Sequence, residues 1–349
     1  MPTYVLEGTA PVRLTRGAVS VHISATGAPV VTDATSPAGP VAVIRPAPHL
    51  LVIPRLDGRT VIRIAHADGG VAFPAGSSVA LTLGVDRPGV SDPDRVMLPA
   101  VDVSGLLSRD LVELDGDGAS ILVRALGTHD ESPLPELASR ARAAARQVLG
   151  VDRVPAAQEV MLVVAMDGSA SVRRLAGTGA VDAVLDVLRG IARVIALDGE
   201  VTRVALVGDT TSWVGAGAGR TPLEAAVAEL RAAPAEIGFR SVQPGLRRLA
   251  PDENVVVYVI TDEIPTDVLA LDAEGDVEGE ARHLVVLAPG GRAPAPTRTS
   301  LPVTPLDLPL DTDLADVLLR TPERLVQLVH SLLSGCFAPG TVLAEKVRR

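Results

Sequence analysis

The chain has 349 residues, a formal net charge of −10 and a hydrophobic fraction of 47%, and only 2% of its residues are aromatic. The acidic balance argues against a protein that binds the phosphate backbone of nucleic acids, because such proteins need a basic surface. The scarcity of aromatic rings argues against sites that stack single-stranded bases. At roughly 100–200 residues per domain, the length predicts two or three domains.

The cysteine content and the apolar runs favour a location in the cytoplasm. Cys336 is the only cysteine, so we expect no intrachain disulfide and no cysteine-based zinc site, as suits a reducing cytosol. Segment 1–17 lacks the charged and apolar regions of a secretory signal. No apolar run approaches the roughly 18 residues of a membrane helix. We therefore expect a cytoplasmic protein with no membrane association.

The first part of the chain, to about residue 127, has the pattern of short strands cut by Pro, Gly and Asp. This spacing is typical of an antiparallel β-sandwich. Sequence DGDG at 115–118 predicts a hairpin loop rather than a calcium loop, because the other carboxylates of an EF-hand are missing. The predicted strands are 19–23, 41–45, 49–54, 60–65, 78–85, 111–114 and 119–126.

The pattern changes after residue 130. Apolar and small residues recur at helical spacing over 132–150, which ends at a glycine. We therefore divide the chain into a β-sandwich domain at 1–130, a helical linker at 131–154 and a further domain at 155–349.

The third region alternates strands with amphipathic helices. Strands 159–167 and 254–261 are apolar on both faces, which predicts a Rossmann-like, doubly wound parallel sheet with helices on both sides. The predicted fold class is thus α/β, with an antiparallel sandwich followed by this sheet. The other predicted strands are 202–208, 211–215 and 282–288, and the predicted helices are 179–199, 221–233, 243–250 and 313–335.

Two of these strands end in an aspartate, at Asp167 and Asp262. Ligands of open α/β sheets bind at the carboxyl ends of the strands, near the point where the strand order reverses. If the two strands are neighbours, both carboxylates lie at one edge, and the hydroxyls of Ser169 and Ser171 can face the same point. Oxygen ligands of this kind suit Mg²⁺, which keeps several waters.

This pattern resembles a known family over about residues 155–335. Segment DGSAS at 167–171 is similar to the Asp-x-Ser-x-Ser signature of von Willebrand factor type A (vWA) domains, and VVVYVITDE at 255–263 to their second metal strand. The resemblance implies a metal-ion-dependent adhesion site in which Asp167, Ser169, Ser171 and Asp262 hold Mg²⁺, or Mn²⁺ or Ca²⁺. The ion would bridge to an Asp or Glu of a partner protein.

One position departs from the family pattern. A gapless match puts Arg240 where the family has a threonine ligand, although Ser241 could serve if the loop shifts by one residue. Thr221 is another hydroxyl in similar local sequence, but it comes one helix too early. A guanidinium at 240 could also neutralise both aspartates without any metal, which would leave a degenerate vWA domain with a structural or interaction role.

The first region has a weaker resemblance. Segments 11–21 and 111–127 are similar to the opening and closing segments of TerD-type tellurium-resistance domains, which are β-sandwiches. The calcium motif of that family has no convincing counterpart here. Together the two resemblances imply a bacterial, cytoplasmic scaffold in a stress response, with a MoxR-type AAA+ ATPase or a TerD-like protein as partner.

Enzymatic readings find less support. Segment 215–221 lacks the first glycine and the lysine of a phosphate-binding loop. Ser169 has neither a nucleophile elbow nor a visible histidine base. We therefore expect a protein that is not an enzyme and has no catalytic residues. A metal-assisted hydrolase, or a nucleotide-using protein with the same sheet, is the less favoured alternative.

Overall fold

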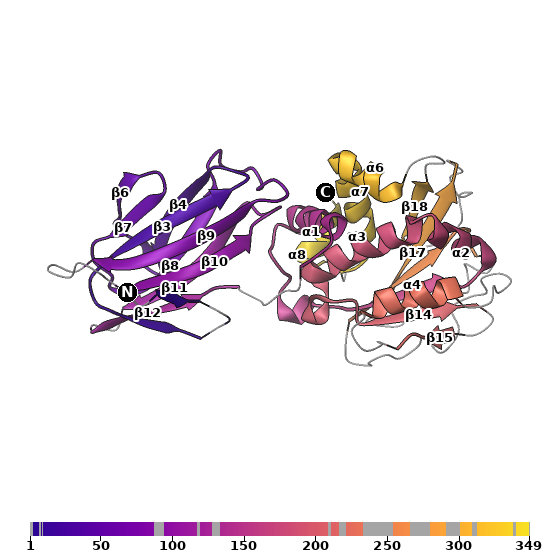
Figure 1. The fold of residues 1–349 in the computed structure, drawn as a ribbon, viewed down its shortest axis with the longest axis horizontal. Helices are drawn as coiled ribbons and strands as arrows, with labels where there is room; N and C mark the ends of the chain where they lie inside the picture. The colour runs from indigo at the N-terminus through magenta and orange to yellow at the C-terminus, as the bar shows by residue number, and fades with distance from the viewer. Residues whose placement is uncertain are drawn as a thin grey trace. The chain divides into compact units, whose positions relative to one another are not determined.

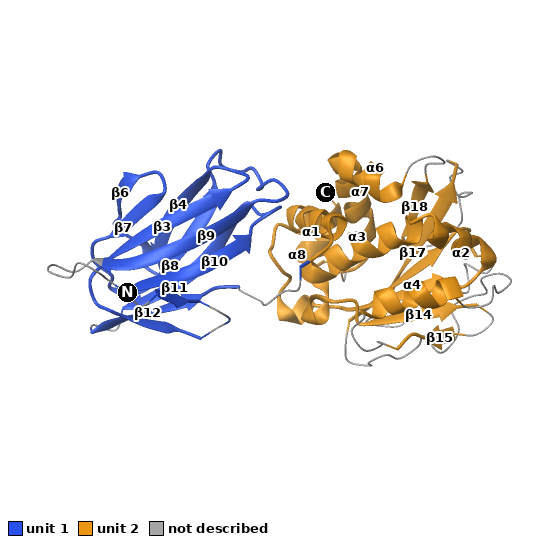
Figure 2. Cartoon of the chain, in the orientation of Figure 1, with its two compact units in different colours: residues 1–133 blue, residues 134–349 orange. Residues whose placement is uncertain are grey.

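The protein is a mixed α/β structure with three six-stranded sheets. Its contacts separate two compact units, Met1–Pro133 and Leu134–Arg349 (Figure 2). The predicted combination of α and β structure is confirmed. The computed structural model describes residues 3–6, 8, 10–86, 94–116, 119–127, 133–208, 211–215, 221–232, 254–265, 280–290, 301–308, 313–337 and 340–348.

The first unit consists of two sheets with the strand orders β1-β10-β9-β3-β7-β6 and β2-β12-β11-β8-β4-β5 (Figure 1). Neighbouring strands are antiparallel except for β1 and β10, which are parallel. The strands are β1 (Thr3–Val5), β2 (Val12–Thr15), β3 (Ala18–Thr26), β4 (Val30–Ser36), β5 (Gly39–Pro40), β6 (Ile44–Ala47), β7 (Leu50–Ile53), β8 (Gly58–His66), β9 (Ser78–Asp86), β10 (Arg95–Asp102), β11 (Ser108–Gly116) and β12 (Ser120–Ala125).

Alternating side chains explain how these two sheets form a sandwich. Val21 and Leu83 of one sheet and Ile64 and Leu114 of the other belong to a single buried cluster, because every second residue of a strand faces the same side. The predicted strand at 41–45 begins only at Ile44. Strands β11 and β12 pair as the predicted hairpin, although positions 117–118 of its loop lie outside the described residues.

The second unit contains the third sheet, with the order β15-β14-β13-β16-β17-β18. All its neighbouring strands are parallel except β15, which runs antiparallel to β14 at one edge. From β13 the chain moves outward to β14 and β15, then returns to β16 on the other side, so the strand order reverses between β13 and β16. The bounds are β13 (Met161–Asp167), β14 (Arg203–Val207), β15 (Thr211–Trp213), β16 (Val255–Thr261), β17 (Glu280–Pro289) and β18 (Val303–Leu308).

The described helices of this unit all contribute to the core on one face of the sheet. The opposite face forms a separate apolar cluster, and the segment 243–250, predicted as a helix, lies outside the described residues. No described helix is both long enough and apolar enough to span a membrane. The helices are α1 (Glu136–Leu149), α2 (Ala170–Gly177), α3 (Ala180–Ile195), α4 (Pro222–Ala232), α6 (Leu314–Arg320), α7 (Pro322–Leu333) and α8 (Val342–Arg348).

Helix α1 belongs to the second unit, although the sequence pattern predicts a separate helical linker at 131–154. It buries Leu137, Ala141 and Leu149 in the same core as α3 and α7. Its small residues let α3 approach closely, because a Cβ on Gly190 would lie 2.2 Å from the Ala138 carbonyl oxygen and 2.8 Å from the Ala141 Cβ. The helix is therefore a packed layer of this unit.

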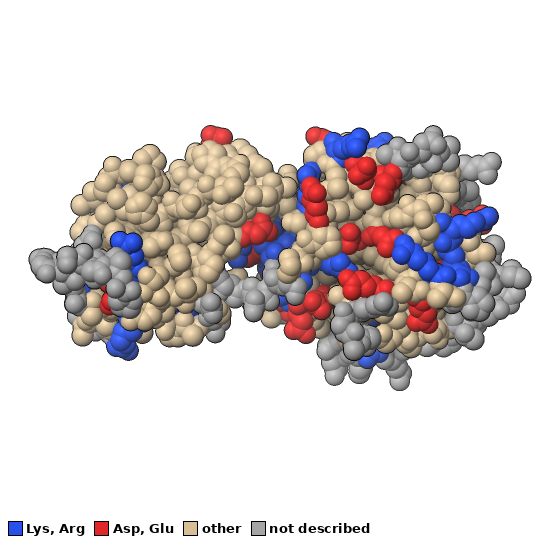
Figure 3. Space-filling model, in the orientation of Figure 1, with Lys and Arg blue, Asp and Glu red and all other residues tan. Residues whose placement is uncertain are grey.

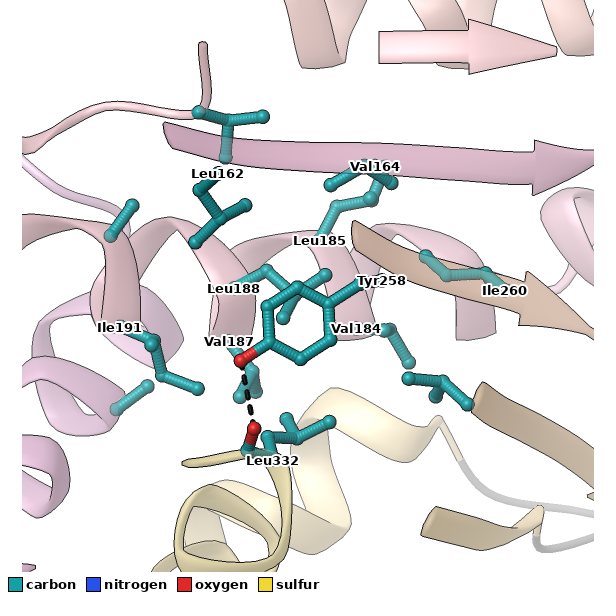
Figure 4. Close-up of a cluster of buried hydrophobic side chains, with 14 of the residues drawn as sticks. Leu162, Val164, Val184, Leu185, Val187, Leu188, Ile191, Tyr258, Ile260 and Leu332 are labelled. Atoms are coloured by element: carbon teal, nitrogen blue, oxygen red, sulfur yellow. Dashed lines mark hydrogen bonds between the residues drawn. The ribbon is translucent and has the colours of Figure 1, made fainter. Parts of the chain in front are cut away.

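Tyr258 of β16 lies at the centre of this core (Figure 4). Its ring is surrounded by aliphatic side chains, and its hydroxyl donates to the Leu332 carbonyl oxygen of α7 at 2.8 Å. The Cys336 Sγ lies 3.2 Å from the same hydroxyl, and burial raises the pKa of that thiol to about 12. A buried hydroxyl needs such partners, so this contact fixes α7 on the sheet.

His283 of β17 makes a second polar link to the same region. Its Nδ1 lies 3.2 Å from the Ser334 carbonyl oxygen, and its Nε2 lies 2.7 Å from the Thr304 hydroxyl. A carbonyl can only accept, so Nδ1 carries the proton and Nε2 accepts from Thr304. Burial lowers the pKa of His283 from 6.5 to about 4, which keeps the ring neutral.

We expect Gly190→Ala to destabilise the second unit by about 1–3 kcal/mol, because its Cβ would collide with the backbone of α1. Urea unfolding measures the change. Gly177→Ala is the matched control, since a Cβ there meets nothing within 4 Å. Equal stability of the two variants would contradict the close packing of α1 on α3.

We also expect the second unit to lose stability as the pH falls from about 6.5 to about 4. Over this range the unfolded His283 takes up a proton and the folded one does not, so its contribution falls by about 3 kcal/mol. Urea unfolding at several pH values should show a shallower acid loss for His283→Gln than for the wild type. Parallel curves for the two proteins would exclude this role of His283.

Candidate functional site

The carboxyl ends of β13 and β16 bring together two polar side chains. Register partners Met166 and Ile260 place Asp167 beside Thr261, and the Thr261 hydroxyl donates to Asp167 Oδ2 at 2.9 Å. Both side chains are buried. The strand order reverses between these two strands, which is where open α/β sheets bind their ligands.

The loop after β13 adds two hydroxyl groups. The Ser169 amide donates to Asp167 Oδ1 at 2.7 Å, and the Gly168 amide donates to the Val207 carbonyl oxygen of β14 at 2.8 Å. The Ser169 hydroxyl caps α2 by accepting from the Val172 amide. Its Oγ lies 3.0 Å from the Oγ of Ser171. The start of α2 therefore holds both serines next to Asp167.

The negative charge of Asp167 is unfavourable in the folded protein when no cation is bound. Burial raises the pKa of Asp167, the hydrogen bonds from Ser169 and Thr261 lower it, and the charge of Asp262 raises it further. The net change is upward, so the folded state disfavours the charged carboxylate. Within the described part of the chain, neither Asp167 nor Asp262 forms an ion pair. A buried negative charge without a cation is costly.

The four residues that the sequence predicts as metal ligands lie at the carboxyl ends of β13 and β16. Asp167, Ser169 and Ser171 are joined by hydrogen bonds, and Asp262 directly follows Thr261, where its charge acts on Asp167. Arg240 and Ser241 lie outside the described residues.

The hydroxyl of Thr221 serves a different purpose. It accepts from the Glu224 amide at 3.3 Å, while the Thr221 amide donates to Glu224 Oε2 at 3.1 Å. This reciprocal pair is a capping box at the start of α4. The helix that the sequence predicts at 221–233 therefore begins directly after this cap.

Thr261 is the residue that the sequence reasoning missed. It is 1% exposed, and its hydroxyl donates to Asp167 Oδ2. The Glu263 carbonyl oxygen lies 3.1 Å from the same hydroxyl and is an alternative acceptor. The available signal was a single polar residue in the last position of an otherwise apolar strand, directly before an aspartate.

The oxygen atoms that could bind a metal ion here come from both carboxylates and hydroxyls. Two carboxylates and the hydroxyls around them are the oxygen ligands that Mg²⁺ and other hard cations prefer. Among the described residues, no three or more His, Cys, Asp or Glu side chains gather into a metal-binding group. Any metal here would therefore depend on the serine hydroxyls and water as much as on carboxylates.

No protein-family model matches the chain, and no curated protein matches it either.

In the absence of divalent cations, we expect Asp167→Asn to stabilise the protein by about 1 kcal/mol at neutral pH. The amide is of equal size and removes the buried charge, and Thr261 can turn its hydroxyl to Glu263. Urea unfolding in EDTA measures the effect. Asp307→Asn, at an exposed position of β18, is the control, and a less stable Asp167→Asn would contradict the cost assigned to the charge.

Proposed function

We propose that the second unit is a vWA-type protein-binding module with a metal-ion-dependent adhesion site. Asp167, Ser169, Ser171 and Asp262 would hold Mg²⁺, with Mn²⁺ or Ca²⁺ as substitutes. The observation that carries this proposal is the buried Asp167 carboxylate, whose pKa is raised by burial and by Asp262. A divalent cation would offset both effects, because it supplies the positive charge that the described neighbours lack.

The strand arrangement supports the vWA reading. The two strands that carry the candidate ligands are the central neighbours of the sheet, and the edge strand β15 is antiparallel. In such an order the candidate ligands would lie at the reversal point, where loops from both halves of the sheet meet. The resemblance of DGSAS and VVVYVITDE to the two metal-binding segments of the family adds to this.

The chemistry also favours capture rather than catalysis. Mg²⁺ keeps several of its waters, so a bound ion would retain a position for an Asp or Glu of a partner. The Ser169 hydroxyl is engaged with Val172 and Ser171, which makes it a helix cap and a candidate ligand rather than an activated nucleophile. The proposed module is therefore not an enzyme.

The surface of the second unit is consistent with recognition through the ion. Figure 3 shows acidic and basic side chains interspersed on one face of this unit, and Arg231 pairs with Asp182 as Arg189 does with Glu224. A face of mixed charge provides little selection for one sign of partner. A metal ion at Asp167 would supply that selection, because it binds carboxylates directly.

The proposed partner is a cytoplasmic protein with an exposed Asp or Glu. The sequence resemblances suggest a MoxR-type AAA+ ATPase or a TerD-like protein in a bacterial stress response. Capture of a partner from native extract should need Mg²⁺, and it should be lost in EDTA and in Asp167→Ala.

Calorimetric titration of the metal-free protein with Mg²⁺ or Mn²⁺ tests the metal directly. We expect one ion per chain, loss of binding in Asp167→Ala and Asp262→Ala, and roughly tenfold weaker binding in Ser171→Ala. Asp307→Asn serves as the control and should bind like the wild type. Absence of binding to the wild-type protein would refute the metal site.

A further variant distinguishes a working metal site from a degenerate vWA domain that binds no metal. If the guanidinium of Arg240 occupies the site, the wild type should bind no ion and Arg240→Thr should gain binding. If the site works as proposed, the wild type itself binds Mg²⁺, and the ion raises its unfolding free energy by mass action.

A further inference from the structure

Two histidines lie next to each other at one face of the first unit. His22 is an exposed residue of β3 between the buried Val21 and Ile23, so it points away from the core of the sandwich. His49 directly precedes β7 and is also exposed. The Ile23 amide donates to the His49 carbonyl oxygen at 2.9 Å, and His22 is the register partner of Leu50. Backbone pairing therefore holds the two residues together.

The rings of this pair are placed as two ligands of one ion would be. Their centroids are 5.1 Å apart and their planes are tilted by 43°, which is not the parallel arrangement of stacked rings. Two imidazoles that bind one tetrahedral cation at about 2.0–2.1 Å through a ring nitrogen have centroids about 5 Å apart. The observed separation needs only ring rotation to reach that geometry.

The ring nitrogens of the pair are available, in contrast to those of the buried histidines. Among the described residues, neither His22 nor His49 has a side-chain hydrogen bond. His283, in comparison, uses both nitrogens, and the Nδ1 of His66 accepts from the Asp68 amide at 3.2 Å. Free imidazole nitrogens at an exposed position can exchange water for a metal ion.

The neighbours of the pair on this sheet are neutral. The register partners of His22 are Thr82 and Leu50, and Met97 is the partner of Thr82 on the next strand. Oxygen-preferring cations such as Mg²⁺ find no carboxylate in this register row, whereas imidazole suits Zn²⁺, Cu²⁺ and Ni²⁺.

We propose that His22 and His49 form a binding site for a divalent transition-metal ion such as Zn²⁺, with water in the remaining positions. Each histidine contributes one ring nitrogen, and the ion joins β3 to the start of β7. The site has two protein ligands, fewer than the four of a structural zinc site, so binding is reversible and responds to the free metal concentration. It is independent of the oxygen site at Asp167.

Calorimetric titration of the full-length, untagged chain with Zn²⁺ tests this site. We expect saturable binding that is weakened at least tenfold in His22→Gln and in His49→Gln. A tenfold excess of Mg²⁺ should not displace the Zn²⁺. Both substituted residues are exposed, and far-ultraviolet circular dichroism with thermal unfolding verifies that the variants remain folded.

Two control variants make the result specific. His330→Gln removes a histidine of α7 in the other unit and should bind Zn²⁺ like the wild type, as should Asp167→Ala. Zn²⁺ affinity that is unchanged in His22→Gln and His49→Gln, or absent from the wild type, would overturn the proposal. Loss of Mg²⁺ binding in Asp167→Ala leaves this site unaffected, so the two sites fail or succeed separately.

Discussion

The parallel pairing of β13 with β16 is the constraint on which the candidate site depends. Both strands are buried along their whole length, so their pairing is fixed by apolar packing on two faces. The register then places Asp167 beside Thr261, with a 2.9 Å hydrogen bond between them. A slip of one residue would turn every side chain of β16 to the opposite face and separate the two groups.

Two buried polar groups of this sheet illustrate different roles. The His283 ring is neutral, and both of its nitrogens have partners, so it ties the sheet to the helical layer at little electrostatic cost. Asp167 also has hydrogen-bond donors, but it lies beside Asp262, and burial and this neighbour raise its pKa. The His283 network thus suits a protein core, whereas the raised pKa of the buried Asp167 carboxylate is the kind of perturbation that marks a candidate functional site.

The two sheets of the first unit present different outer faces. On the sheet that contains β8 and β11, Arg63 pairs with Asp110 and Arg59 with Glu113. On the other sheet, His22 and His49 have neutral neighbours such as Thr82. The proposed nitrogen ligands thus lie on the first unit and the proposed oxygen ligands on the second, so the two proposed sites would select different metal ions.

Several local features could be predicted from the sequence: sandwich strands such as β3, β8 and β9, the apolar strands that end at Asp167 and Asp262, and the serine pair. These follow from residue type and short-range periodicity. The sequence pattern did not predict β4, β10 or β18, and Pro305 of β18 is unusual except in an edge strand. It also did not predict that α1 packs in the second unit. The pairing of β13 with β16 and the hydrogen bond from Thr261 to Asp167 emerge only in the folded protein, because pairing between strands distant in sequence is set by packing and register.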